Sequence, residues 1–430
     1  MTSQVVGQER KSSDIQLDAT QLEAIDACCD LKRRVVAVTG AAGTGKTTIL
    51  QHVYEQLYSQ NKSVVLCSPT GKAAKRITEV TGIQARTFHR LLEYPHPGER
   101  DEKTGKTLIS TDPKKDRSKP IEFVVCLADE YAMANVEIHR NLLDALPPGG
   151  VIRMFGDANQ LQPIETNKRL QREPSSFIRM LDKFAGIRLE TIHRQAGDSS
   201  IISNGQRIIM GSMPLRKPDF QLKITDAPVQ NVLDFIQDSL LDEIDYGTIS
   251  NQIISPTKVG WVGTEALNSA IQQMLQPGSK PYLIVARHKW SKIEEQRIYL
   301  GDKVINTVNN YPLNVFNGET GIVKEFLDDG SIIIDFGDKI VEFPVDLEIE
   351  GKYGMYIMNP QEDLDLAYVI TTHKSQGSEY DRICYVMNKS RPFLLNRKNF
   401  YTAISRARTH VTIISDAKSI ELSLVKKGDK

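Results

Sequence analysis

The residues whose spacing predicts chemistry most directly form a glycine-rich loop. Residues 40–47 read GAAGTGKT and fit the phosphate-binding pattern G-x-x-x-x-G-K-[ST], between a β-branched run at 35–38 and a helical stretch at 47–57. Glycines let backbone N–H groups face phosphates, the lysine reaches the terminal phosphates, and the threonine hydroxyl can bind Mg²⁺. An ordinary glycine-rich turn is the alternative, and the flanking strand and helix argue against it. The predicted phosphate-loop residues are Gly40, Ala41, Ala42, Gly43, Thr44, Gly45, Lys46, Thr47 and Thr48.

Further along the chain lie the other groups that hydrolysis of a triphosphate requires. Asp129 and Glu130 follow an apolar, strand-like run, where an Asp would bind Mg²⁺ and a Glu would activate water. Gln160 follows the next such run and could sense the terminal phosphate. Arg194 and Arg406 lie beyond the first α/β segment, so they could neutralise the transferred group only across an interdomain cleft. Residue types alone leave open that both arginines are surface groups.

Alternating strands and helices must position these residues. Strand-like runs at 63–67, 123–128 and 151–155 are interleaved with helical stretches, which predicts a parallel sheet covered on both faces. A second α/β segment follows residue 193, with helices predicted at 198–210 and from 264, and strands at 252–255, 366–371 and 410–415. Between them, residues 301–344 have the short period and tight-turn pairs of a small β-meander.

Composition restricts the class of protein without identifying a partner. The 430 residues exceed what one core usually supports, so we expect two or more domains. Lys+Arg and Asp+Glu both number 54, so any nucleic-acid surface must be local. No apolar run reaches membrane-spanning length, and the start MTSQVVGQERK lacks a signal or transit pattern, so we expect a cytoplasmic protein without a membrane segment. Reduced, mostly buried thiols are expected at Cys28, Cys29, Cys67, Cys126 and Cys384.

Taken in order, these segments resemble the motifs of superfamily 1 helicases of the RecD and Dda type, from Gln21 to Arg408. The nucleotide motifs are similar to LDATQLEAI, GAAGTGKT, ADEYAM, GDANQLQPI, LETIHRQ and FYTAISRAR in this chain. The resemblance implies ATP and Mg²⁺ as cofactors, with Mg²⁺ at Thr47 and Asp129. It implies that Gln21 reads adenine, that Arg194 contacts the γ-phosphate, and that Arg406 is an arginine finger.

Three further segments resemble the parts of these helicases that contact a DNA strand: SPTGKAA, ARTFHRLL and TTHKSQGSEY. The last also implies nucleotide contacts at Gly377 and Glu379. From residue types alone, His89 and His373 could instead be structural histidines, and Lys72, Lys75 and Arg76 could be the solvated face of a helix. The DNA contacts that the resemblance implies are Pro69, Thr70, Thr87, His89, Thr372, His373 and Lys374.

The resemblance also implies an architecture of two RecA-like P-loop NTPase domains with two insertions. Domain 1A is expected at 1–94 and 121–196, with a β-hairpin pin, 1B, at 95–120. Domain 2A is expected at 197–300 and 354–430, with an SH3-like β-barrel, 2B, at 301–353. Two departures from the family pattern are Ala132, where serine is usual, and Gln162, where proline is usual. Neither supplies a catalytic group, so they affect the expected coupling rather than hydrolysis.

The function implied by the resemblance is that of an ATP-dependent DNA helicase moving 5′ to 3′ on single-stranded DNA and unwinding forked duplexes. One alternative is a strand-dependent ATPase that translocates without robust unwinding. Another is a nucleotide-gated DNA-binding scaffold, against which the intact Lys46, Glu130 and Arg406 argue. We expect a monomer, since no coiled-coil pattern is present. Replication or recombination proteins are possible partners, and the motifs do not choose among replication, recombination and repair.

Overall fold

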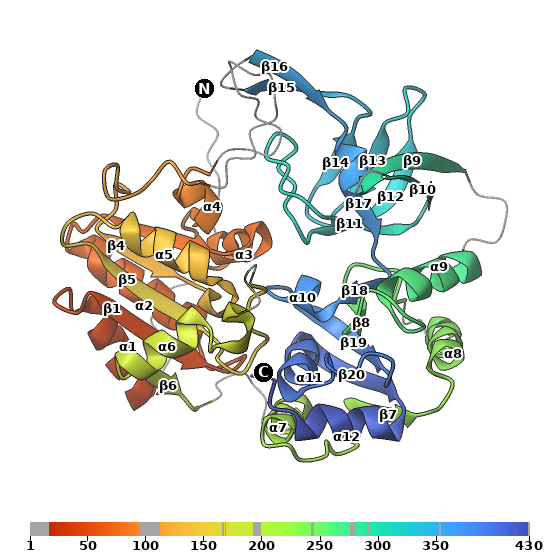
Figure 1. Ribbon diagram of the computed structural model, residues 1–430, viewed down its shortest axis with the longest axis horizontal. Helices are drawn as coiled ribbons and strands as arrows, with labels where there is room; N and C mark the ends of the chain where they lie inside the picture. Colours follow the sequence, from red (N-terminus) through yellow and green to blue (C-terminus); the bar gives the residue numbers. More distant parts are fainter. Residues whose placement is uncertain are drawn as a thin grey trace.

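The computed structural model describes residues 17–94, 112–165, 167, 169–191, 199–241, 245–275, 281–289, 292–351 and 354–428. These residues form two α/β domains and a smaller β body, which Figure 1 shows at the left, lower right and upper right. Arg194 and residues 95–111 of the predicted pin lie outside the described ranges. Among the described residues, no helix is both long enough and apolar enough to cross a membrane.

The first α/β domain is a parallel sheet in the order β3-β2-β4-β5-β1-β6. Alternate residues of each strand enter opposite cores: Val36 and Val38 pack with one set of helices, and Ala37 packs with the other. This alternation explains why helices cover both faces, as expected for a parallel sheet. The strands are β1 (Val35–Gly40), β2 (Val64–Ser68), β3 (Ala85–Thr87), β4 (Val125–Ala128), β5 (Val151–Gly156) and β6 (Ile187–Leu189).

Helices of this domain divide cleanly between the two faces of the sheet. One face is covered by α1 (Ala19–Cys29), α2 (Lys46–Ser59) and α3 (Gly71–Thr81), and the other by α4 (Phe88–Leu91), α5 (Val136–Asp144) and α6 (Ser176–Lys183). Asp18 and Gln21 form a capping box that begins α1. The helix predicted at 47–57 is confirmed by α2.

The second α/β domain is a five-stranded parallel sheet in the order β18-β8-β19-β20-β7. Its strands are β7 (Phe220–Ile224), β8 (Asn251–Ser255), β18 (Val369–Thr371), β19 (Tyr380–Met387) and β20 (Ala407–Ser415). One face packs on α7 (Ser200–Ile209), α11 (Arg397–Ile404) and α12 (Ala417–Val425), and the other on α8 (Pro228–Leu241) and α9 (Thr264–Leu275). A short helix, α10 (Thr372–Ser375), follows β18 and points toward the first domain (Figure 1).

The small β body is an antiparallel sheet in the order β14-β13-β12-β11-β17 with two hairpins beside it. Its strands are β11 (Lys303–Asn306), β12 (Thr320–Phe326), β13 (Ile332–Asp335), β14 (Ile340–Phe343) and β17 (Leu364–Leu366). The hairpins are β9 (Tyr282–Lys289) with β10 (Lys292–Tyr299), and β15 (Leu347–Gly351) with β16 (Gly354–Met358). Val285 and Ile298 of the first hairpin join the core of the sheet, so this body uses residues on both sides of 301–353.

The strand predicted over residues 366–371 is confirmed only at 369–371, which form β18. The chain leaves the small sheet after β17 and enters the second α/β sheet at β18, so the two pieces belong to different sheets. The buried side-chain amide of Gln252 donates to the carbonyls of Ala367 and Tyr368 at 3.0 Å each, which satisfies the backbone where the chain changes sheet. The apolar pattern of a segment does not show whether its residues pair within one sheet or are divided between two.

The prediction of reduced, mostly buried cysteines is confirmed. All five thiols are free, and every one except the half-buried Cys29 is buried.

Residues 112–120, the described part of the predicted pin, pack back onto the first domain. Lys115 is 8% exposed and pairs with Glu93 at 3.3 Å, and Arg117 pairs with Asp144 at 2.9 Å.

Candidate functional site

The phosphate loop joins β1 to α2, and its shape depends on glycine. Gly43 and Gly45 have φ values of 84° and 81°, a left-handed region that favours glycine. The ammonium of Lys46 donates to the carbonyls of Gly40 and Ala41 at 2.7 and 2.9 Å, so its charge lies inside the loop. A cavity of about 470 Å³ faces this loop. Of the predicted loop residues, it is lined by Ala42, Gly43, Gly45, Lys46, Thr47 and Thr48.

Gln21 lies behind the loop rather than among the residues that line the cavity. Its side chain donates to the Thr44 carbonyl at 3.2 Å and accepts from the Asp18 N–H at 3.0 Å. A Cβ atom on Gly45 would lie 2.4 Å from the Gln21 amide nitrogen, so a larger residue there would displace the Gln21 side chain. In this structure the contact that Gln21 makes is with the loop itself. Gly40, Ala41 and Thr44 likewise form the loop's frame and do not line the cavity.

Two carboxylates close the opposite side of the cavity at the end of β4. Asp129 is 7% exposed, and its carboxylate accepts the Glu130 N–H at 2.8 Å. Burial, reinforced by the adjacent charge of Glu130, raises the pKa of Asp129 to about 6, and the nearby Lys46 opposes this rise. Glu130 has a left-handed φ of 50°, a strained conformation for a residue with a side chain. A buried acid and the Thr47 hydroxyl, which line the same cavity, are a donor set that fits a hard cation bound with phosphates.

Residues of the second α/β domain complete the cavity. Gly377, Glu379 and Arg406 line it together with the first-domain groups. Arg406 is 4% exposed, and its guanidinium is held by the carbonyls of Thr402 and Ser378 at 3.2 and 3.4 Å. The Glu379 carboxylate pairs with Arg76 of α3 at 2.9 Å, which also spans the two domains. The structure therefore brings Lys46, Glu130 and Arg406 to one cavity. Arg194 lies outside the described residues.

Three residues of the second domain that sequence reasoning missed hold this interface together. The Tyr401 hydroxyl donates to the buried Asp157 carboxylate at 2.7 Å, and the Thr402 hydroxyl accepts the Leu161 N–H at 2.8 Å. The Gln376 side chain donates to the Leu161 carbonyl at 3.2 Å. Both ends of segment 157–161 are thus fixed by the second domain. Between these ends Gln160 lines the cavity, and its buried side-chain oxygen has no hydrogen-bond partner among the described residues.

Several residues predicted to contact DNA make contacts within the protein in this structure. The hydroxyls of Thr70 and Thr87 cap α3 and α4 by accepting backbone N–H groups at 3.2 and 3.1 Å. Thr372 is fully buried, and Lys374 pairs with Asp365 at 3.1 Å. Burial lowers the pKa of His373, so its ring is neutral at neutral pH. Pro69, beside Thr70, lies at the carboxyl end of β2.

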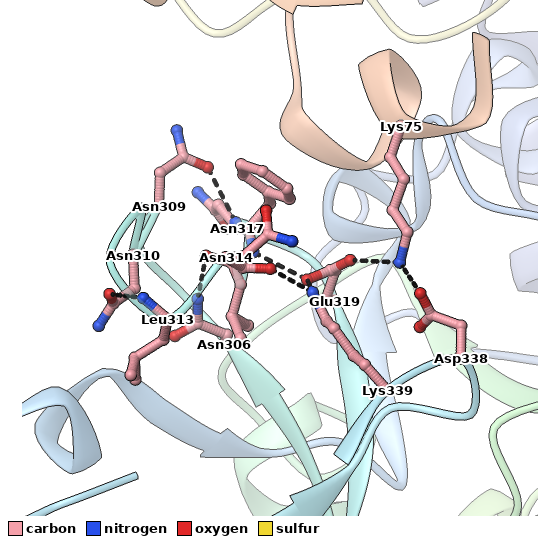
Figure 2. Close-up of polar contacts among 12 residues, drawn as sticks. Lys75, Asn306, Asn309, Asn310, Leu313, Asn314, Asn317, Glu319, Asp338 and Lys339 are labelled. Carbon is pink, nitrogen blue, oxygen red and sulfur yellow. Dashed lines mark hydrogen bonds and ion pairs between the residues drawn. The ribbon is translucent and has the colours of Figure 1, made fainter. Parts of the chain in front are cut away.

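His89 lies in a second cleft, of about 830 Å³, between the first domain and the small sheet. One wall carries the rings of His89 and Tyr94, whose centres are 5.0 Å apart and whose planes are tilted by 55°. The same wall carries three cationic side chains, Arg86, Arg90 and Lys114. The other wall is formed by residues 307–317, of which Asn309 and Asn317 are drawn in Figure 2. Cations, amides and aromatic rings form a surface that suits a nucleic-acid strand. Asn309, Tyr311 and Asn317 were not predicted as contacts, because their loop meets the first domain only in the folded chain.

The fold and the cavity define the class of protein: a P-loop NTPase with two RecA-like domains. Three family models match the chain in order. An AAA domain matches residues 21–166, an "ATP-dependent RecD-like DNA helicase SH3 domain" matches 267–336, and a "UvrD-like helicase C-terminal domain" matches 366–414. With the relatives below, these matches show that the chain is similar to RecD-like helicases over most of its length.

Curated relatives include the ATP-dependent RecD2 DNA helicase of Deinococcus radiodurans. It is 28% identical over 400 residues, which cover 92% of this chain and 49% of the relative, so the chain spans about half of that protein's length. The RecD subunit of the RecBCD enzyme from Mycobacterium tuberculosis is 25% identical over 439 residues, covering 93% of this chain and 69% of the relative. A solved Bacteroides Pif1 helicase, in complex with ADP-AlF3 and single-stranded DNA, has a TM-score of 0.58 at 22% identity, with 95% of each chain covered. This last likeness concerns the fold.

Proposed function

We propose that this chain is an ATP-driven motor that translocates 5′ to 3′ on single-stranded DNA and unwinds forked duplexes. The observation that carries the proposal is the composition of the first cavity, which Lys46 and Glu130 line from one domain and Arg406 lines from the other. A site divided in this way is complete only when the domains are closed, so nucleotide state and domain separation are coupled. Coupling of this kind is what a motor requires.

In the proposed mechanism, Lys46 and the loop amides hold the β- and γ-phosphates of ATP. Thr47 and Asp129 would bind Mg²⁺, which when present neutralises phosphate charge. The Glu130 carboxylate takes a proton from a water molecule as the water oxygen attacks the γ-phosphorus, and the bond from the γ-phosphorus to the bridging oxygen of ADP breaks. Arg406, with Arg194, stabilises the charge that develops on the transferred group. The products are ADP and inorganic phosphate.

The strand is proposed to lie across both domains and through the second cleft. Arg86, Arg90 and Lys114 would contact phosphates, and Tyr94 and Tyr311 offer faces on which bases can stack. His89, Pro69, Thr70, Thr87, Thr372, His373 and Lys374 remain proposed strand contacts. For the buried Thr87 and Thr372 the contact would be through the backbone, at the start of α4 and of α10.

The proposed function is tested by ATP hydrolysis with and without single-stranded DNA, together with unwinding of forks that carry a 5′ or a 3′ tail. We expect strong stimulation by the strand, and unwinding only from the 5′ tail. Stimulation without unwinding would identify a translocase. Lack of stimulation would contradict the motor and would leave a nucleotide-gated scaffold. Replication or recombination proteins as partners, and a monomeric state, belong to the same proposal.

A further inference from the structure

The loop of the small sheet that faces the first domain is held in one shape by its own side chains (Figure 2). The Asn309 side chain accepts the Asn317 N–H at 2.9 Å. Glu319 accepts the Phe316 N–H at 2.9 Å and the Lys339 ammonium at 2.9 Å. Residues 306–319, which we call the wall loop, are therefore held in shape by hydrogen bonds within the small β body. An ordered wall can define the width of the cleft beside it.

Lys75 on α3 connects the first domain to this loop. Its ammonium lies 3.3 Å from the Glu319 carboxylate and also pairs with Asp338, on the turn between β13 and β14 (Figure 2). Glu319 is 6% exposed, so its charge is largely shielded from water, whereas Asp338 is exposed. Burial acts to lower the pKa of Lys75, but the two carboxylates more than offset it, so the pKa is raised and the ammonium stays charged.

Two further contacts join α3 and α4 to the wall loop. A Cβ atom on Gly71, at the start of α3, would lie 2.4 Å from the Cβ of Phe316, so only glycine lets the helix approach the wall loop this closely. The Arg90 guanidinium lies 5.6 Å from the centre of the Tyr311 ring. Helices α3 and α4 therefore contact the wall loop at several points, and two of the residues involved, Arg90 and Tyr311, also line the second cleft.

From the sequence alone, Lys75 could be a solvated lysine on a helix face or a lysine that binds DNA phosphate directly. The structure argues against both, because two carboxylates of another domain share its single ammonium. A cation neutralised in this way attracts a phosphate weakly. What it does provide is a connection between two bodies that are far apart in the sequence.

We propose that Lys75, Glu319 and Asp338 form a clasp that holds the wall loop against the first domain and thereby retains a DNA strand in the second cleft. The three are positioning residues, since they act on the strand through the wall loop. The inference deepens the proposed function, on which it rests for the identity of the strand. The contact between the wall loop and the first domain does not itself depend on DNA.

Asp338→Asn distinguishes the clasp from a direct DNA contact by the sign of its effect. Asp338 is on an exposed turn, so the variant should fold. If the clasp exists, loss of the acid opens the cleft, and a labelled oligothymidylate dissociates about two- to fivefold faster at low salt, the range expected for a partly exposed ion pair. If Lys75 binds phosphate directly, removal of the competing acid slows dissociation instead. Asp328→Asn, on another exposed turn of the same sheet, makes the same charge change and should leave the rate unchanged.

A charge exchange gives a second test. Lys75→Glu places a third acid beside Glu319 and Asp338 and should speed dissociation at least as much as Asp338→Asn. Adding Asp338→Lys to that variant restores opposite charges, and the dissociation rate should return to within about twofold of the original. A double variant that is no slower than Lys75→Glu alone would overturn the clasp.

Closure can also be measured without DNA, by energy transfer between dyes at Tyr58→Cys on α2 and Ile340→Cys on β14. Both positions are well exposed, at 65% and 70%, and a Cys29→Ser background removes the thiol that is only half-buried. Asp338→Asn should lower the transfer efficiency. A lowered efficiency in a protein that binds no strand would refute the proposed function and keep the clasp. Unchanged efficiency with unchanged dissociation would refute the clasp alone.

Discussion

The Tyr401 hydroxyl gives the most direct test of coupling between the two domains. Tyr401 comes from α11 and Asp157 from the end of β5, and their 2.7 Å hydrogen bond spans the domain interface. Burial, with the charge of Asp157, raises the pKa of Tyr401 well above its usual range, so the phenol keeps its proton and donates it. Tyr401→Phe removes one oxygen atom and leaves a buried carboxylate without its interdomain donor.

The size of the effect follows from the kind of bond. A hydrogen bond to a charged group contributes about 1.5–3 kcal/mol net. Because this bond exists only when the domains are together, its loss lowers the population of the closed state. About 1.4 kcal/mol corresponds to tenfold, so strand-stimulated kcat/KM for ATP should fall about ten- to hundredfold. The assay is steady-state phosphate release at saturating oligothymidylate, with the unfolding midpoint measured in parallel.

A matched control uses the same chemistry at another place. The Tyr368 hydroxyl donates to the buried Asp302 carboxylate at 2.8 Å, between β18 and the small sheet and away from the nucleotide cavity. Tyr368→Phe should lower stability by a similar amount while strand-stimulated hydrolysis by the folded protein is preserved. The reasoning fails if Tyr401→Phe keeps turnover within twofold, or if both variants lose turnover equally.

Three further outcomes follow from the same structure. Glu130→Gln should bind a fluorescent ATP analogue normally but release phosphate at least about a hundredfold more slowly, as expected for loss of a general base. Burial lowers the pKa of Lys303 from 10.5 to about 7. The buried charge therefore lowers the unfolding free energy fully below pH 7, and the unfolding free energy rises as the pH increases from 7 toward 10.5. Lys303→Met should remove that rise from the pH dependence of the urea unfolding free energy, measured against the parent protein. Desolvation lowers the pKa of His89, which is therefore neutral at pH 7.5. In titrations of DNA affinity against salt, Arg86→Gln should reduce the slope by about one while His89→Gln leaves it unchanged.

Local sequence patterns were sufficient to predict several features of this structure. The phosphate loop could be read from the sequence because a strand, a glycine-rich turn and a helix lie within residues 35–59, and their geometry needs no distant partner. The two parallel sheets were likewise predictable, since buried strands and amphipathic helices alternate along the chain. The small sheet was located by its tight turns, Asp329-Gly330 and Gly337-Asp338, where Gly330 and Gly337 have φ values of 87° and 91°.

Other features depend on contacts between residues hundreds of positions apart, which no local period records. Tyr401 with Asp157, and Lys75 with Glu319, meet only because the separate bodies pack together. The same packing assigns β17 and β18 to different sheets and adds the β9–β10 hairpin to the small core. The sequence by itself therefore determined the phosphate loop and the two-domain plan. Only the tertiary structure decided which side chains join the domains, because the energy of a long-range contact depends on geometry that is fixed after each domain has folded.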